Sequence, residues 1–209
     1  MLLKPYKTIA DIAVDEFVEK RSRFIGSIMP VTTEQQALEF ISELKSKYWD
    51  ATHNVYAYIL RDGQIKRYSD DGEPQGTAGV PVLDVLQKEG LTDVAIVVTR
   101  YFGGILLGGG GLVRAYSHCA KLAVNMAQFK IMTPCTAFEL EFDYSLYGKI
   151  NYILPKYNAV TIDSEFGALV KMNLIIGNDA YMGFCKELRE LTSDLTVPVY
   201  KKELFYNMA

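Results

Sequence analysis

Apolar and polar positions alternate along the first third of the chain in the manner of β-strands. The pattern predicts strands over residues 6–13, 23–31, 54–60 and 65–68, with an Asp62-Gly63 turn between the last two. Phe17 and Val18 either continue the first strand or pair in a hairpin. Thr33 and Gln36 have the spacing of a capping box, and the apolar residues that follow predict a helix ending near Tyr48.

A long polar loop over residues 69–79 leads to the central part of the chain. We expect a short helix over residues 82–88, with Pro81 in its first turn and Gly90 at its end. The continuous apolar, β-branched run of residues 94–99 predicts a strand that is buried on both faces. A helix over residues 112–128 follows.

The last third of the chain has a different order of predicted elements. Strands are expected over residues 136–143, 159–166, 169–176 and 199–205, and helices over residues 146–156 and 179–191. This β-α-β-β-α-β order is that of a ferredoxin-like domain. With a boundary at Thr133-Pro134, the pattern predicts an α+β protein with two domains, 1–132 and 135–209.

Composition restricts the classes of function. The 209 residues are 49% hydrophobic and carry a net charge of −3, so any nucleic-acid binding must be local rather than spread over a basic surface. The three cysteines, Cys119, Cys135 and Cys185, are widely spaced, which favours reduced thiols and a cytoplasmic location. No apolar run has the length of a membrane helix, and no secretory signal is expected.

Glycines crowd the segment between the buried strand and the helix after it. Gly103, Gly104, Gly108, Gly109, Gly110 and Gly111 follow Arg100-Tyr101-Phe102. A glycine-rich turn that opens a helix presents free N–H groups to an anion, although glycines serve equally for close packing of a loop on a sheet. The run has neither the Lys-Ser/Thr ending of a P-loop nor the spacing of a dinucleotide-binding fingerprint.

Basic and aromatic residues flank these glycines. Arg114, His118 and Lys121 share one stripe of the expected helix, and Arg100 ends the buried strand. These side chains could bind phosphate while Tyr101 and Phe102 stack on bases. The alternative is a solvated basic face with both aromatic residues in the core.

Two further groups could carry chemistry. His53, with Asp50 nearby, is either an acid–base or phosphate-binding residue or a structural histidine. Asp70, Asp71 and Glu73 could hold a cation, but they lack the spacing of a calcium loop, and the usual interpretation of such a cluster is a solvated loop. No metal site, cofactor or catalytic set is therefore expected, and an enzyme would have to use His53, Asp71 and Glu73.

The segment from Gly79 to Gly108 resembles the signature of the YigZ/IMPACT family. Its elements are Gly79, Val82-Leu83, Leu86, Leu91, Val97-Val98, Arg100, Tyr101-Phe102, Gly103-Gly104, Leu107 and Gly108. Other matching segments are Ser22-Arg23-Phe24, Ala51-Thr52-His53, Asp71-Gly72-Glu73-Pro74 and Gly76-Thr77-Ala78-Gly79. With the ferredoxin-like tail, the resemblance covers essentially the whole chain.

The resemblance implies an N-terminal α/β sandwich similar to domain IV of elongation factor G and to GHMP kinases. The C-terminal domain is then similar to domain V of that factor. In GHMP kinases a glycine-rich turn holds nucleotide phosphate, and Gly108–Gly111 would be the local equivalent, although the kinases' serine-rich ending is missing. Domain IV of the factor works at the ribosomal decoding centre, which implies a role in translation.

The leading hypothesis is a translation-associated module that binds RNA, the ribosome or a translation factor. Arg100, Tyr101, Phe102, the glycine-rich turns, Arg114, His118 and Lys121 would form its site. The alternatives are an enzyme or binding protein for a small phosphorylated or nucleotide ligand, and an adaptor that binds another protein.

Overall fold

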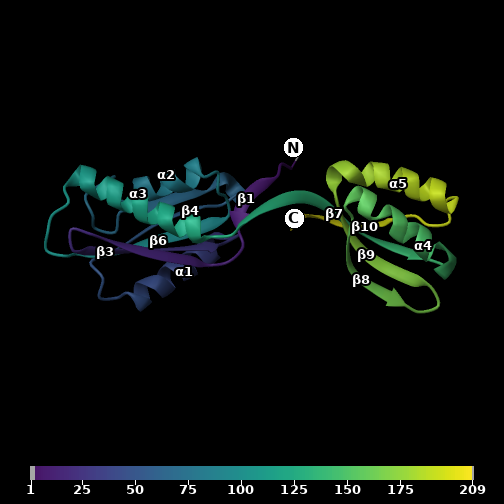
Figure 1. Cartoon of the computed structure of the whole chain (residues 1–209), viewed down its shortest axis with the longest axis horizontal. Helices are drawn as coiled ribbons and strands as arrows, with labels where there is room; N and C mark the ends of the chain where they lie inside the picture. The colour runs from purple at the N-terminus through teal and green to yellow at the C-terminus, as the bar shows by residue number, and fades with distance from the viewer. Residues whose placement is uncertain (1–2, 209) are drawn as a thin grey trace. The chain divides into compact units, whose positions relative to one another are not determined.

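The computed structural model describes residues 3–208, which form two compact units. The N-terminal unit is Tyr6–Lys130, and the C-terminal unit comprises the residues after Lys130 together with residues 3–5. Helices and sheets occur in both, so the predicted two-domain α+β architecture is confirmed (Figure 1). None of the helices within residues 3–208 combines the length and apolar character needed to cross a membrane.

The N-terminal unit is a five-stranded antiparallel sheet between two helical layers. Its strands are β2 (Ala13–Glu19), β3 (Ser22–Pro30), β6 (Val94–Tyr101), β4 (His53–Ile59) and β5 (Lys66–Ser69), in that spatial order. Helix α1 (Glu34–Lys47) covers one face, and α2 (Gly79–Lys88) and α3 (Gly109–Met126) cover the other (Figure 1).

Strand β6 is central because both of its faces are buried. Val94, Ile96 and Val98 pack in the cluster beneath α2 and α3. Ala95 and Val97 pack in the cluster beneath α1. The two-residue period of a strand divides the apolar run between two cores, which explains why its hydrophobicity is continuous rather than alternating.

The first predicted strand is wrong in its extent. It is divided into β1 (Tyr6–Ile9) and β2, and the break lies at residues 10–12. Phe17 and Val18 pair with β3 in a hairpin whose turn residues, Lys20 and Arg21, both have positive φ. A two-residue turn of this kind suits the twist of a hairpin, and neither residue is the glycine or asparagine that usually reveals it in a sequence.

Helix α1 begins as predicted, with Thr33 Oγ1 accepting a hydrogen bond from Gln36 N at 3.2 Å. Helix α2 begins earlier than predicted, at Gly79 rather than Val82. Its first turn is supported by the Asp70 carboxylate, which accepts hydrogen bonds from Ala78 N and Gly79 N. A side chain nine residues upstream thus satisfies N–H groups that a local cap would otherwise take.

The C-terminal unit has the predicted ferredoxin-like order of elements. These are β7 (Phe129–Phe142), α4 (Tyr144–Ile153), β8 (Val160–Phe166), β9 (Val170–Gly177), α5 (Asn178–Thr192) and β10 (Val199–Asn207). The strands lie in the order β10-β7-β9-β8, and α4 and α5 cover one face of the sheet (Figure 1). Short 3-10 turns occur at Asp62–Gln64 and Pro155–Tyr157.

Strand β7 is longer than predicted and runs through Thr133 and Pro134. Pairing with β9 starts only at Cys135, so the missing N–H of Pro134 removes no bond from that ladder. The same strand also neighbours β1 in the sheet, and the two compact units divide within it, after Lys130.

Replacement of Asp70 by alanine should destabilise the N-terminal unit. The carboxylate accepts hydrogen bonds from Gly76 N at 2.9 Å, Ala78 N at 3.1 Å and Gly79 N at 2.7 Å, and the variant loses all of them. We expect a loss of about 1–3 kcal/mol in the free energy of unfolding. Urea unfolding measures it, with Asp62→Ala in the exposed β4–β5 turn as a control that should change little.

Candidate functional site

The C-terminal end of β6 gathers most of the predicted site residues. Arg100 lies opposite Phe24 on β3 and opposite His53 on β4. The segment that follows β6 passes the β2–β3 hairpin and then enters α3 at Gly109. Residues far apart in the sequence therefore meet around the glycine-rich start of this helix.

Arg100 is buried, which contradicts its expected role as a phosphate ligand on the surface. Its Nη1 donates to Glu73 Oε1 at 2.6 Å, and both side chains are about 95% buried. The Tyr116 hydroxyl donates to the same oxygen at 2.7 Å. Burial and the neighbouring Glu73 carboxylate raise the pKa of Tyr116, so this hydroxyl stays protonated at neutral pH. Arg100 continues the two-residue period of Val94, Ile96 and Val98, a signal that could have revealed its burial.

His53 has one ring nitrogen fixed and the other turned to Glu73. Its Nδ1 lies 2.8 Å from the backbone oxygen of Asp71, and because a carbonyl only accepts, Nδ1 carries the proton. Nε2 lies 3.7 Å from Glu73 Oε1. Asp50, the neighbour suggested by the sequence, instead accepts a hydrogen bond from Tyr101 Oη at 2.9 Å.

The acidic loop does not converge on one point. Asp70 binds backbone N–H groups of its own loop, while Asp71 accepts from Lys45 Nζ at 2.7 Å and from Asn54 N at 2.6 Å. Glu73 turns inward to Arg100. Each carboxylate therefore has separate partners, and no group of three or more His, Cys, Asp or Glu side chains in residues 3–208 is placed to hold a metal ion.

The glycines of the turn divide into structural and unconstrained positions. At Gly103 an added Cβ would lie 2.1 Å from the backbone carbon of Arg21, so only glycine allows this close approach. Gly104 and Gly108 have positive φ, and a Cβ at Gly111 would lie 3.1 Å from Leu107 Cβ. A Cβ at Gly109 would make only an ordinary contact, and one at Gly110 would meet nothing within 4 Å.

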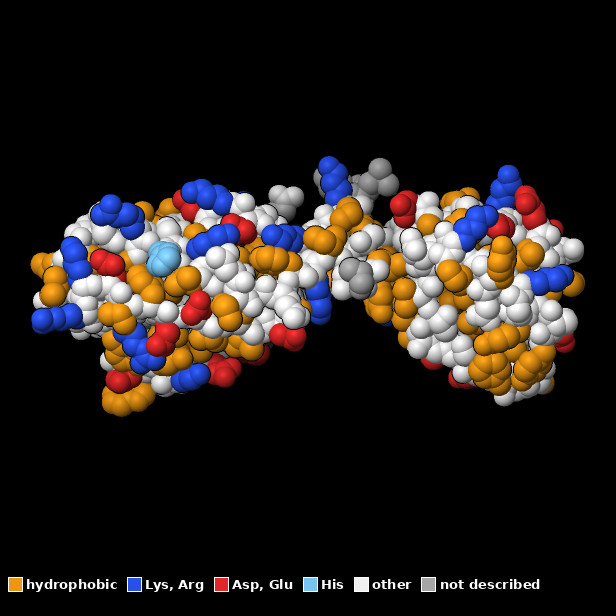
Figure 2. Space-filling model, in the orientation of Figure 1, with side chains coloured by type: hydrophobic (Ala, Val, Ile, Leu, Met, Phe, Trp, Pro, Cys, Tyr) orange, Lys and Arg blue, Asp and Glu red, His pale blue; other side chains and the backbone are white. Residues whose placement is uncertain are grey.

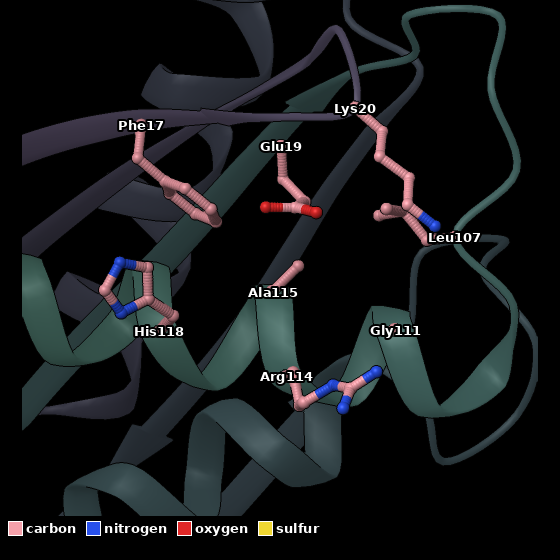
Figure 3. Close-up of a pocket in the computed structure, with 8 residues that line it drawn as sticks. All are labelled: Phe17, Glu19, Lys20, Leu107, Gly111, Arg114, Ala115 and His118. Atoms are coloured by element: carbon pink, nitrogen blue, oxygen red, sulfur yellow. The ribbon is translucent and has the colours of Figure 1, made fainter.

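A cavity of about 280 Å³, here called the basic pocket, lies between the β2–β3 hairpin and the first turns of α3. Figure 3 shows Glu19 and Lys20 on the hairpin side, and Arg114 and His118 projecting from α3. Phe17 packs edge-on against His118, with ring centroids 4.7 Å apart. Lys20 and Arg114 are exposed and form no ion pair with any residue that the structure describes. Two cations are therefore available to an anion here, beside the one carboxylate, Glu19, that lines the same cavity.

A second cavity of about 370 Å³, here called the Glu73 pocket, adjoins the basic pocket through Leu107. Its lining comprises Thr52, His53, Glu73, Pro74, Arg100, Phe102, Leu106, Leu107, Gly108, Gly109 and Leu112. It thus combines apolar walls with the buried ion pair and the start of α3.

The remaining predicted residues are not all brought together. Phe102 is 44% exposed and lines the Glu73 pocket, but Lys121 forms an ion pair with Glu89 at 2.6 Å and lines neither pocket. Two exposed residues were missed. Lys20 reaches the site through the hairpin turn, and Trp49 lies on the loop that Asp50 ties to the end of β6. That Trp49 is the chain's one tryptophan, in a polar context, was an available signal.

Alanine should have opposite effects at two of these glycines. Gly103→Ala places a methyl group against the Arg21 backbone, and we expect a loss of about 1–3 kcal/mol or more. Gly110→Ala adds a better helix former in open space and should gain up to about 1 kcal/mol. Thermal unfolding of both variants checks this, and equal effects would contradict the assignment of the close approach to Gly103.

Removing Glu73 alone from the buried Glu73–Arg100 pair should lower the free energy of unfolding more than removing both charges. Glu73→Ala leaves the Arg100 charge without its partner, and we expect a loss of about 3–5 kcal/mol. The double variant Glu73→Ala/Arg100→Met removes the uncompensated charge and should recover part of that stability. Urea unfolding of the three proteins measures the coupling; a double variant less stable than Glu73→Ala would refute it.

Comparisons with known proteins agree with this architecture. Residues 20–124 match the Impact N-terminal domain, and residues 140–194 match a domain of unknown function, DUF1949. The IMPACT family member YvyE of Bacillus subtilis is 38% identical over 196 residues, which cover 92% of this chain and 89% of that protein. The IMPACT family member YigZ of Escherichia coli is 34% identical over 160 residues, covering 75% and 78%.

A solved crystal structure of a hypothetical protein has the same fold. It aligns with a TM-score of 0.63 at 29% identity and covers 96% of this chain and 99% of its own. Two domain matches in the expected order and relatives above 30% identity over most of the chain establish the relationship. The chain belongs to the IMPACT family.

Proposed function

We propose that the protein is a translation-associated module that binds single-stranded RNA, free or in the ribosome, at the glycine-rich start of α3. The observation that carries the proposal is the basic pocket, where Lys20 and Arg114 lie exposed and unpaired beside the first turn of α3. A helix N-terminus adds N–H groups and a partial positive charge. The combination matches the chemistry of a phosphate backbone.

Exposed rings and apolar side chains near the same turn support single strands over duplexes. Trp49 is 82% exposed and Phe102 is 44% exposed, and both lie by the end of β6. Aromatic faces stack on unpaired bases, whereas a duplex conceals its bases from them. Figure 2 shows Lys and Arg side chains around the end of the N-terminal unit where α3 begins, with acidic side chains among them.

The C-terminal unit offers a less suitable surface. Its sheet face opposite α4 and α5 carries two ion pairs, Lys171–Glu141 and Lys201–Glu139. Asp163 and Glu165 lie on the same face by their register with β9. Sheets of this fold that bind RNA use aromatic side chains on that face. Carboxylates there would repel phosphate, so we assign RNA binding to the N-terminal unit.

The proposal revises the residues of the site and keeps its location. Lys20 joins Arg114 and His118 as candidate phosphate contacts, while Arg100 and Lys121 are occupied by Glu73 and Glu89. A cytoplasmic location goes with the proposal and agrees with the three unpaired cysteines.

Removing the two free cations should weaken RNA binding and its dependence on salt. For Lys20→Ala/Arg114→Ala we expect the slope of log K against log salt to fall by about 1.4, since each lost contact to a single strand removes about 0.7. Fluorescence anisotropy with labelled single-stranded RNA, titrated from low to moderate salt, measures the slope.

The matched control is Lys149→Ala/Lys186→Ala, which makes the same change in net charge at exposed positions of the C-terminal unit. It should leave the slope nearly unchanged. If both double variants lost the same affinity, binding would depend on net charge and the assignment to the basic pocket would be wrong.

A further inference from the structure

The Glu73 pocket has apolar walls and a small polar part that includes two hydrogen-bond acceptors, His53 and Glu73. Its apolar residues are Pro74, Phe102, Leu106, Leu107 and Leu112. The polar side chains that line it are Thr52, His53, Glu73 and Arg100. Small-molecule sites are typically cavities of about 300–1,000 Å³ with mostly apolar walls and a few polar groups, and this cavity of about 370 Å³ lies within that range.

Glu73 has one oxygen engaged and one open. Oε1 accepts hydrogen bonds from Arg100 and Tyr116, whereas Oε2 accepts none from the residues that the structure describes. The enclosed, unpaired polar side-chain atoms in the described part of the chain are Arg100 Nε, Thr196 Oγ1 and Asn207 Oδ1. Glu73 Oε2 is not one of them, so it is not fully enclosed, and the Glu73 side chain lines the cavity.

His53 presents a second acceptor to the same cavity. Because its Nδ1 donates to the Asp71 carbonyl, Nε2 of the neutral ring carries a lone pair. The two acceptors select a ligand that brings N–H donors. Arg100 does not contact such a ligand through the enclosed Nε; it is a positioning residue that holds Glu73 in place.

Positively charged groups lie next to the Glu73 pocket. Gly108 and Gly109, at the start of α3, line one side, and the basic pocket with Lys20 and Arg114 begins beyond Leu107. A ligand that fits both pockets therefore has a flat group with N–H donors in the Glu73 pocket and a negative charge in the adjoining basic pocket. A nucleotide with an exocyclic amino group on its base has both.

We infer that the Glu73 pocket receives a base with an exocyclic amino group, that is cytosine, adenine or guanine rather than uracil, of the single-stranded RNA whose phosphates bind the basic pocket. The amino group donates to Glu73 Oε2 or His53 Nε2, and the ring lies against Phe102 and the leucines. This inference rests on the proposed function. Uracil fits less well, because the oxygen it carries in place of the cytosine amino group would face an acceptor.

Matched homopolymers test the preference. Labelled RNA octamers of cytidine and of uridine have the same length and charge, so their difference in affinity reports the base alone. We expect the cytidine octamer to bind about 10-fold more tightly or better, as for a hydrogen bond to a charged group. Equal affinities, or a preference for uridine, would overturn the inference.

Variants of two glycines test whether the base preference arises in the Glu73 pocket, and they leave the buried ion pair unchanged. Gly109 lines the Glu73 pocket, and an added Cβ makes only a 3.9 Å contact with Thr77 Cγ2, so Gly109→Leu should fold and obstruct the cavity. Gly110 lines neither pocket and faces open space, so Gly110→Leu is the matched control. The ratio of cytidine to uridine affinity should fall to near 1 in the first and persist in the second.

The outcomes separate this inference from the proposed function. Salt-dependent binding of both octamers with equal affinity would support RNA binding and reject the base pocket. Neither octamer binding, with a larger thermal shift from cytidine monophosphate than from uridine monophosphate, would reject the RNA module and keep the pocket's base preference. No binding of any of the four probes would overturn both.

Discussion

A buried ion pair between Glu73 and Arg100 organises the site end of the N-terminal unit. It connects the loop before α2 to the central strand β6, and through Tyr116 it also reaches α3. Separation of two such charges within a protein interior is strongly unfavourable, so the three elements are held together as one body. The Glu73 pocket lies at this junction, where the loop, the strand end and the helix start supply walls, and the basic pocket adjoins it between the first turns of α3 and the β2–β3 hairpin.

Ion pairing differs among the cations near α3 of this acidic protein. The chain carries a net charge of −3, yet its cations near α3 are not equivalent. Arg100 is neutralised by Glu73 and Lys121 by Glu89, whereas Lys20 and Arg114 are exposed without such partners among the described residues. Local pairing, rather than overall charge, therefore decides which side chains are available to a phosphate group.

The glycine-rich turn has two kinds of position, and the distinction matters for function. Gly103 is required by the close backbone of the β2–β3 hairpin, so its role is structural. Gly109 and Gly110 are helical positions where a side chain would fit, and glycine lowers helix stability there. Structural demand accounts for glycine at the first position, whereas at the other two the structure leaves space for a side chain.

Local patterns in the sequence determined much of the architecture. The capping pair of α1, the apolar run of β6 and the order of elements after Cys135 depend on neighbouring residues and on periods of 2 and 3.6, which a sequence displays directly. Only the tertiary structure decided the chemistry of the site. Glu73 meets Arg100 across 27 residues and Tyr116 across 43, and a hairpin turn without glycine places Lys20 in the same pocket as Arg114. Periodicity indicates which face of an element is buried, but the packing of distant segments decides which residues contact that face.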